Sequence, residues 1–252
     1  MVVKPLLKHI IPKPLHPLAK RVYTKLKRLW YFGFKFTCPC CGGHFRKFLP
    51  YGVQPRPNAL CPKCGSLERH RLLWLYLKNR TNFFQKRLKV LDIAPMPFFK
   101  EKCEALPNID YISADIVSPL ATVRMDVQEI PFPDDQFDCI ICYHVLEHIL
   151  DDQKAMGELY RVLKPGGWAI IQSPIDINRE KTYEDPSLPP EERGRIFGGR
   201  EHIRIYGRDY KDRLEKAGFI VKVEPYAREL GDSMIKKYNL IKTEDIYLCL
   251  KH

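Results

Sequence analysis

Apolar and polar positions between residues 126 and 174 follow the order strand, helix, strand. The run FDCIICY at 137–143 is short, apolar and bounded by turn-forming residues, as expected for a buried strand. Apolar side chains then recur at helical spacing through 151–163, after two aspartates that can cap a helix. The sequence LKPGG ends this helix, and WAIIQSP at 168–174 begins a second buried strand. Two such strands joined by a helix form a βαβ crossover, so the pattern predicts a parallel sheet.

The same order of residues carries a family resemblance. The stretch DVQEIPFPDDQFDCIICYHVLEHILDD, followed by RVLKPGG, is similar to the second half of a class I S-adenosylmethionine-dependent methyltransferase of the small-molecule type. The resemblance implies an α/β fold, a Rossmann-like seven-stranded sheet with helices on both faces, and S-adenosylmethionine as cofactor. The other strands are expected at residues 88–94, 111–116, 121–127, 219–226 and 244–251, and further helices at 66–80 and 208–219.

The net charge of +12 is divided unevenly along the chain. Residues 1–89 contain 20 lysines and arginines against one acid, Glu68, whereas residues 90–252 contain 22 against 29. A basic front end on a mildly acidic body favours an anionic partner for the front end, such as RNA, phospholipid headgroups or a phosphorylated substrate. A merely solvated basic face is the alternative.

The first 36 residues carry nine lysines or arginines and no acid. Leu18, Val22, Leu26 and Trp30 repeat every four residues among basic side chains, which predicts an amphipathic helix. Such a helix can lie on an anionic membrane surface, or it can pack on the protein and expose its lysines to water. No apolar run is long enough to span a bilayer, and charges and prolines interrupt the region where a signal peptide would be unbroken. We therefore expect a cytoplasmic protein, peripheral at the membrane if the helix binds lipid.

Two C-P-x-C-G motifs, CPCCG and CPKCG, follow this segment. In each, two cysteines three positions apart can bind one metal ion while the glycine lets the chain turn back. The 19 residues between Cys41 and Cys61 are a usual gap between two paired ligand sets. Four thiolates without carboxylates favour tetrahedral zinc in a closed, structural site. Cys38, Cys41, Cys61 and Cys64 are the predicted zinc ligands.

Other assignments of these motifs stay open. Cys40 lies at the variable position of the first motif and could pair with Cys38 in place of Cys41. His44 and His70 lie nearby, and either could replace a cysteine ligand. Disulfides are disfavoured in a reducing cytoplasm, and a redox Cys-x-x-Cys pair requires a strand before it and a helix opening on it.

The loop after the first predicted strand departs from the methyltransferase pattern, which normally has acid-x-Gly-x-Gly-x-Gly there. This chain has Asp92-Ile-Ala-Pro-Met-Pro, and no glycine occurs between residues 65 and 157. Pro95 and Pro97 fix φ at about −65° and remove two amide donors, so we expect an extended loop with Ala94 as its only small side chain. The resemblance assigns Asp92 and Ala94 to the cofactor site. It extends to a group of bacterial methyltransferase-like proteins with a zinc knuckle in front and a similar Ala-Pro loop.

Acidic residues end the next two predicted strands. Asp115 follows the second strand, where a carboxylate can accept both ribose hydroxyls of a nucleotide cofactor; capping a helix is its alternative role. The resemblance assigns Asp126 to the adenine amino group, with Met125 and Val127 against the adenine faces. These positions fall at the carboxyl ends of parallel strands, where open α/β sheets bind ligands. Tyr143, at the end of the fourth strand, is a further candidate for the cofactor site.

Candidate substrate-side residues follow the fourth strand. His144 is the candidate catalytic base, because a histidine can accept a proton near neutral pH. Glu147 and His148 are expected to connect the loop to the helix. The long polar segment 175–207 is typical of a lid or binding segment. Its candidate substrate contacts are Tyr183, Asp185, Arg200, His202, Arg204 and Tyr206.

These observations predict three parts: a basic segment (1–36), a zinc-binding module with a linker helix (37–82) and a class I methyltransferase domain (83–252). The predicted function is transfer of a methyl group from S-adenosylmethionine to a small molecule, a sugar or a lipid. One alternative is an RNA methyltransferase that docks through its basic zinc module. The other is a catalytically inactive cofactor-binding scaffold, suggested by the missing glycines.

Overall fold

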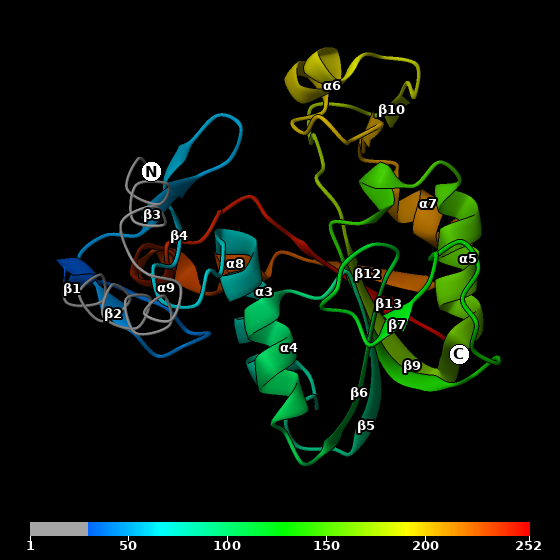
Figure 1. Cartoon of the computed structure of the whole chain (residues 1–252), viewed down its shortest axis with the longest axis horizontal. Coiled ribbons are helices and arrows are strands. Elements are labelled where there is room, and N and C mark those ends of the chain that lie inside the picture. The colour runs from blue at the N-terminus through cyan, green and yellow to red at the C-terminus, as the bar shows by residue number, and fades with distance from the viewer. Residues whose placement is uncertain (1–29) are drawn as a thin grey trace, which may run out of the picture. The chain divides into compact units, whose positions relative to one another are not determined.

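The structure, a computed structural model, describes residues 30–252. The amphipathic helix predicted from Leu18 onward therefore lies outside the described residues. The described residues divide into two compact units, one formed by residues 30–74 together with Leu230–Ile241, and the other by Leu75–Glu229 with Lys242–His252. Figure 1 shows the elements of both units, coloured along the chain.

The first unit contains the two cysteine motifs and short antiparallel strand pairs. Its elements are β1 (Phe32–Thr37) paired with β2 (His44–Phe45), β3 (Leu49–Tyr51) paired with β4 (Arg56–Leu60), the start of α3 (Glu68–Arg80), and α9 (Gly231–Tyr238). The buried Arg71 of α3 donates hydrogen bonds to the carbonyls of Tyr238 (2.7 Å) and Asn239 (2.8 Å). Residues 230–241, which the sequence placed with the methyltransferase domain, thus fold with the cysteine motifs.

The second unit is built on a seven-stranded sheet with the order β12-β13-β9-β8-β5-β6-β7. Its strands are β5 (Leu88–Ile93), β6 (Ile109–Asp115), β7 (Val123–Arg124), β8 (Phe137–Tyr143), β9 (Leu163–Gln172), β12 (Ile220–Glu224) and β13 (Ile246–Leu250). Neighbours from β7 to β9 pair in parallel, whereas β13 runs antiparallel to both β9 and β12. The predicted seven-stranded α/β fold is confirmed.

Helices cover both faces of this sheet, which explains why its central strands are continuously apolar. The helices are α4 (Pro97–Glu104), α5 (Asp152–Val162), α7 (Tyr210–Lys216) and the short α8 (Tyr226–Glu229). Figure 1 shows α4 on one side of the sheet and α5 and α7 on the other. Leu91 and Ile140 from the sheet share a fully buried core with Met156 and Leu159 of α5 and Leu214 of α7. The cap predicted for α5 is present, since the Asp151 carboxylate accepts from the Lys154 amide at 2.9 Å.

Two boundaries differ from the sequence prediction. The predicted third strand, 121–127, is reduced to the two residues of β7, because the side chain of Asp126 accepts hydrogen bonds from the chain that turns after it. The strand predicted from Trp168 begins at Leu163, so LKPGG both ends the helix and starts β9, although Gly166 within it takes a left-handed φ of 76°. Among residues 30–252, no helix combines the length and the apolar character that crossing a membrane requires.

The long connection after β9 contains small elements of its own. These are β10 (Tyr183–Glu184), α6 (Pro190–Ile196) and β11 (Arg204–Ile205), with β10 and β11 paired antiparallel. A parallel bridge joins Ile175 to Tyr206, so the two ends of this connection lie side by side. The segment is therefore a folded hairpin-like insertion, in keeping with the expectation that so long a connection is not an idle loop.

Candidate functional site

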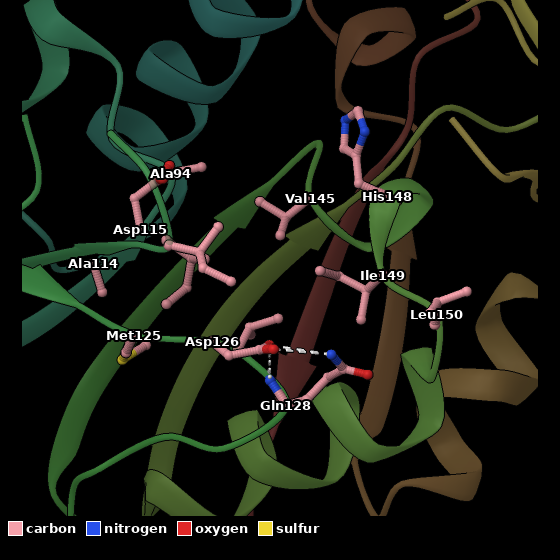
Figure 2. A pocket seen from close by; sticks show the side chains of 13 residues that line it. Ala94, Ala114, Asp115, Met125, Asp126, Gln128, Val145, His148, Ile149 and Leu150 are labelled. Atoms are coloured by element: carbon pink, nitrogen blue, oxygen red, sulfur yellow. Dashed lines mark hydrogen bonds between the residues drawn. The ribbon is translucent and has the colours of Figure 1, made fainter. Parts of the chain in front are cut away.

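A cavity of about 330 Å³ opens at the carboxyl ends of the parallel strands. Figure 2 shows its wall. It is lined by residues from the ends of β5 and β6, from the turn after β7 and from the loop after β8: Ile93, Ala94, Ala114, Asp115, Ile116, Met125, Asp126, Val127, Gln128, Val145, His148, Ile149 and Leu150. Five residues assigned to the cofactor from sequence, namely Ala94, Asp115, Met125, Asp126 and Val127, are thus brought together. His148 was expected from sequence only to connect the loop to the helix, and the other lining residues were not predicted: Ile93, Ala114, Ile116, Gln128, Val145, Ile149 and Leu150.

The two acids of the cavity are each held by backbone amides. One carboxylate oxygen of Asp115 accepts from the amides of Val117 (2.8 Å) and Ser118 (2.7 Å). Asp126 accepts from the amide of Gln128 (2.8 Å) and from its side-chain amide at 3.1 and 3.2 Å, which Figure 2 shows. These bonds fix the carboxylates in place. Both bonds of Asp115 use the same carboxylate oxygen.

The glycine-free loop after β5 is shorter and less extended than predicted. Ala94 has a φ of 55°, the left-handed region that glycine favours, and its amide donates to the carbonyl of Ala114 at 2.8 Å. Pro97 is the first residue of α4. The prediction of an extended loop was wrong because a φ of about −65° also suits the first helical turn, where no amide donor is needed. The chain turns sharply at Ala94 at a cost of about 1 kcal/mol.

Asp92 lies beneath the cavity rather than on its wall. Its carboxylate is 1% exposed and accepts a hydrogen bond from the hydroxyl of Tyr111. Burial raises the pKa of Asp92 to about 7, against the opposing effects of the Tyr111 hydrogen bond and the charge of Lys100. Asp92 is absent from the lining residues. The predicted role of Asp92 at the cofactor site stays a prediction.

Asp92→Asn should change the pH dependence of stability. The folded-state pKa of about 7 exceeds that of an unfolded aspartate, so the contribution of Asp92 is fully present below about pH 4 and is lost as the pH rises through about 7. The variant keeps an acceptor for Tyr111 but does not titrate. Its free energy of unfolding relative to wild type should therefore rise by about 2 to 3 kcal/mol between pH 5 and pH 8, measured by urea unfolding. Asp110→Asn, an exposed acid on β6, is the matched control. An unchanged difference would contradict this account.

Tyr143 and His144, at the end of β8, do not line the cavity. The Tyr143 hydroxyl lies 3.5 Å from the carboxylate of Glu244. His144 has a φ of 59°, and its Nδ1 lies 3.3 Å from Oε1 of the buried Glu147. Burial alone would raise the pKa of Glu147, but the His144 hydrogen bond and the charges of His144 and His148 hold it below its usual range. Glu147 is thus an ionised carboxylate that orients His144.

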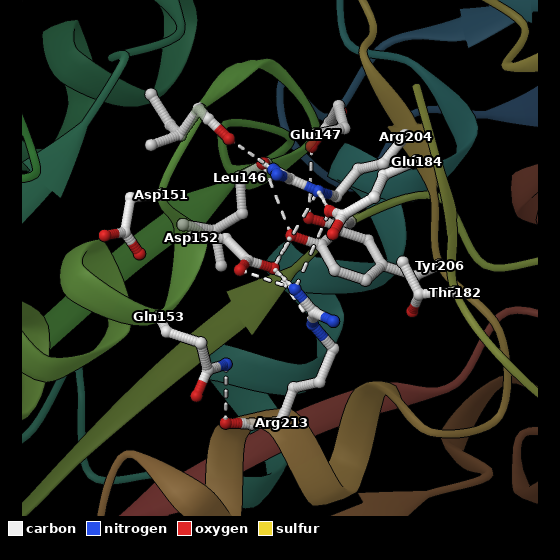
Figure 3. A network of polar contacts seen from close by, with 12 residues as sticks. Leu146, Glu147, Asp151, Asp152, Gln153, Thr182, Glu184, Arg204, Tyr206 and Arg213 are labelled. Atoms are coloured by element: carbon white, nitrogen blue, oxygen red, sulfur yellow. Dashed lines mark hydrogen bonds and ion pairs between the residues drawn. The ribbon is translucent and has the colours of Figure 1, made fainter. Parts of the chain in front are cut away.

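A buried network fastens the cavity loop after β8 to the returning insertion, as Figure 3 shows. Arg204 donates to the carbonyls of Leu146 (2.7 Å), Ile149 and Leu150 (2.9 Å). Beside it, the buried Asp152 accepts from the hydroxyl of Tyr206 and from a guanidinium of α7. Arg204 and Tyr206 were predicted substrate contacts. That prediction was wrong, because both side chains are at most 2% exposed and are used to hold the loop.

Replacing Arg204 with Met should destabilise the protein by about 3 kcal/mol, because the carbonyl of Leu146 loses its donor in a buried hydrogen bond and those of Ile149 and Leu150 lose theirs in partly buried ones. The matched control is Arg200→Met, whose side chain is 60% exposed in its pair with Glu191. That control should change the free energy of unfolding by less than about 0.5 kcal/mol. Urea unfolding followed by far-UV circular dichroism measures both. Equal effects of the two substitutions would rule out the proposed role of the network.

The four predicted zinc ligands gather in the first unit. The sulfur atoms of Cys38, Cys41, Cys61 and Cys64 all lie within 4.8 Å of one another. The Cys38 and Cys64 sulfurs are 3.6 Å apart, and those of Cys41 and Cys61 are 3.8 Å apart. Zinc bonded to sulfur at about 2.3 Å in a tetrahedron requires roughly 3.8 Å between sulfurs. The cluster therefore has the dimensions and the donors of a tetrahedral metal site.

Cys40 lies close to the four-cysteine cluster in the sequence, but its thiol has a different partner. Gly42 and Gly65 adopt left-handed φ values of 66° and 75°, which turn each motif back on itself. Ser66 Oγ lies 3.2 Å from the sulfurs of both Cys38 and Cys64. The buried Cys40 thiol instead donates to the carbonyl of His70 at 3.7 Å, and no disulfide forms among the nine cysteines. The alternative pairing through Cys40 is not the arrangement adopted.

Three features together define a class I methyltransferase fold. These are the strand order, the antiparallel β13 in an otherwise parallel sheet, and the cavity at the carboxyl ends of the strands. Residues 76–171 match the model of a family described as "Methyltransferase domain". The resemblance drawn from residues 126–174 is thereby confirmed. The matched region begins after the four cysteines, so it does not bear on the metal cluster.

Relatives and solved structures agree with this class. The chain is 30% identical over 130 residues to the "Ubiquinone/menaquinone biosynthesis C-methyltransferase UbiE" of Vibrio campbellii (strain ATCC BAA-1116), covering 50% of this chain and 49% of the relative. It is 43% identical over 56 residues to the protein of the same name from Proteus mirabilis (strain HI4320), covering 22% of each. The chain thus spans half or less of the length of these curated relatives. The "[4+2]-Cyclase SpnF" has a similar fold, with 13% identity, a TM-score of 0.52 and coverage of 85% of this chain and 91% of that one.

Proposed function

We propose that the protein transfers the methyl group of S-adenosylmethionine to a small-molecule, sugar or lipid acceptor. The observation that carries the proposal is the cavity at the carboxyl ends of the sheet, where two fixed carboxylates stand among apolar side chains. Bound there, S-adenosylmethionine supplies an electrophilic methyl group on a sulfonium. Its reaction depends on alignment and on exclusion of water more than on acid-base groups.

The cavity residues match the parts of this cofactor. Asp115 would accept hydrogen bonds from the ribose hydroxyls, and Asp126 would accept one from the adenine amino group. Met125 and Val127 offer buried apolar surface to the adenine ring. His144 is the proposed base for an acceptor that must lose a proton, because Glu147 orients its ring. The nine unpaired cysteines suit a reducing compartment, so we place the activity in the cytoplasm.

Asp115→Asn should weaken binding of S-adenosylhomocysteine by about 10-fold or more, because an NH2 group, which cannot accept a hydrogen bond, replaces the carboxylate oxygen proposed to accept from the ribose hydroxyls. The asparagine keeps an oxygen for the amides of Val117 and Ser118, so the turn is retained. Isothermal titration calorimetry measures the change, and Asp110→Asn on the same strand is the matched control. Failure of the folded wild-type protein to bind millimolar S-adenosylhomocysteine would overturn the proposal.

The acceptor class is tested by supplying methyl-labelled S-adenosylmethionine with a fractionated cell extract. Label in the small-molecule or lipid fraction supports the leading proposal. Label in RNA supports the second candidate, and cofactor binding without any transfer favours the inactive scaffold.

An RNA acceptor is the second candidate, favoured by exposed aromatic side chains in the first unit. Trp30, Phe32 and Phe34 are 67%, 55% and 80% exposed, and the guanidinium of Arg46 lies 5.0 Å from the Trp30 ring. Exposed rings beside cations can stack on single-stranded bases. If RNA binds here, Phe34→Ala should lower the affinity for a single-stranded oligonucleotide about 10-fold, and affinity should fall steeply with salt. Val53→Ala, which removes an apolar side chain that is 67% exposed but not aromatic, should leave the affinity unchanged.

We propose zinc as the ion of the four-cysteine cluster, with a structural role in the first unit. The cysteine cluster of the wild-type protein should hold one zinc per chain, and Cys64→Ser should lose most of this zinc because one thiolate ligand is gone. Cys40→Ala should retain the metal, since the Cys40 thiol bonds to a carbonyl outside the cluster. Elemental analysis of the purified proteins measures the content. A zinc-free but folded wild type, or equal loss in both variants, would contradict the assignment.

A further inference from the structure

A second group of metal-binding side chains lies beside the cavity, in the second unit. Glu147 and His148 belong to the short 3-10 helix η2 (Leu146–His148), and His202 comes from the insertion that returns to it. One ligand atom from each of these three residues lies within 4.8 Å of the other two. His148 also lines the cavity. The group is separate from the cysteine cluster and uses different donors.

Both imidazole rings are held in a fixed tautomer. Nδ1 of His148 lies 3.2 Å from the carbonyl of Glu201, and Nδ1 of His202 lies 2.9 Å from the carbonyl of Phe197. A carbonyl only accepts, so each Nδ1 must carry the proton. In the neutral rings, each Nε2 then holds a lone pair that can bind a metal ion. A backbone carbonyl behind the far nitrogen is the usual support of a metal-bound histidine.

The third donor is the buried carboxylate of Glu147. Its Oε2 accepts from the hydroxyl of Ser173 at 3.0 Å, while Oε1 lies 3.3 Å from Nδ1 of His144. The same Oε1 lies 4.0 Å from Nε2 of His202, which is too long for a hydrogen bond. With metal bonds of about 2.1 Å, two ligand atoms stand roughly 3.0 Å apart at a right angle and 4.2 Å apart when opposite. The 4.0 Å separation falls within that range.

We propose that Glu147, His148 and His202 bind a divalent transition-metal ion at the wall of the cavity. Two imidazoles and one carboxylate suit zinc, iron or cobalt rather than magnesium or calcium, which prefer oxygen ligands throughout. The three ligand atoms lie within 4.8 Å of one another, so small side-chain movements are enough to bring them to metal-bonding distances. Three protein ligands leave coordination positions for water or for an oxygen of a bound molecule. That the molecule is the methyl acceptor is a step that rests on the proposed function.

The probe is Co²⁺, added to protein that has first received one equivalent of zinc, which the four thiolates of the cysteine cluster bind in preference to two imidazoles and a carboxylate. We expect one Co²⁺ per chain by isothermal titration calorimetry, with an absorption spectrum that lacks sulfur-to-cobalt charge transfer. His148→Ala should weaken binding about 100-fold or more, since it removes a direct ligand on an exposed position where folding is not at risk. His202→Ala should do the same. Glu201→Gln is the matched control, because it changes a neighbouring carboxylate but keeps the backbone carbonyl that supports His148.

Several results would overturn the site. These are the absence of Co²⁺ binding to the zinc-loaded protein, undiminished binding by both histidine variants, or a sulfur-to-cobalt band showing exchange into the cysteine cluster. Binding of S-adenosylhomocysteine is measured on the same samples without cobalt. A protein that binds the nucleoside but no cobalt disproves the metal site alone, and one that binds cobalt but no nucleoside disproves the proposed function alone.

Discussion

Parallel pairing of β5, β6 and β8 is the constraint on which the cavity depends. Ile93 pairs with both Ala114 and Cys142, so the three strands end together at one edge of the sheet. Residues that follow the strands are far apart in the sequence but must meet at this edge. The core beneath them is apolar and buried on both faces, so polar side chains can only collect where the strands stop. The fold thus gathers the acids before any ligand is present.

Because polar side chains collect at this edge, some charged groups there are buried away from water and require partners. Glu147 and Asp152 are both nearly fully buried, and a buried carboxylate is tolerated only with hydrogen-bonding or cationic partners. Asp152 finds them in Tyr206 and Arg213, and Glu147 in Ser173 and His144. The insertion after β9 is therefore part of the cavity wall's support. Arg204 of this insertion stabilises the loop after β8 by donating hydrogen bonds to its backbone carbonyls.

The repeating apolar pattern was sufficient to predict the parallel strands, because burial on both faces leaves a clear signature at 137–143 and 88–93. Spacing was likewise sufficient for the cysteine cluster, since two paired motifs have few ways to meet. The roles of Arg204 and Tyr206 were beyond prediction, because polarity alone does not tell whether a side chain meets a substrate or a backbone carbonyl. The sequence also did not predict that residues 230–241 associate with the cysteine motifs, because this association depends on hydrogen bonds to the backbone. Arg71 recognises backbone carbonyls there, and these are identical in every residue.

The glycine-free turn after β5 shows how a motif can lose its sequence signature and keep its geometry. Ala94 takes the left-handed conformation that glycine would adopt freely, and the helix still begins three residues later at Pro97. The cost of about 1 kcal/mol is small beside the burial of the neighbouring strand. The added methyl group lies on the cavity wall, where it keeps the backbone farther from a ligand than glycine would. Under the proposed function, recognition of the nucleoside would then depend more on Asp115 and Asp126, whose carboxylates the surrounding amides already hold in place.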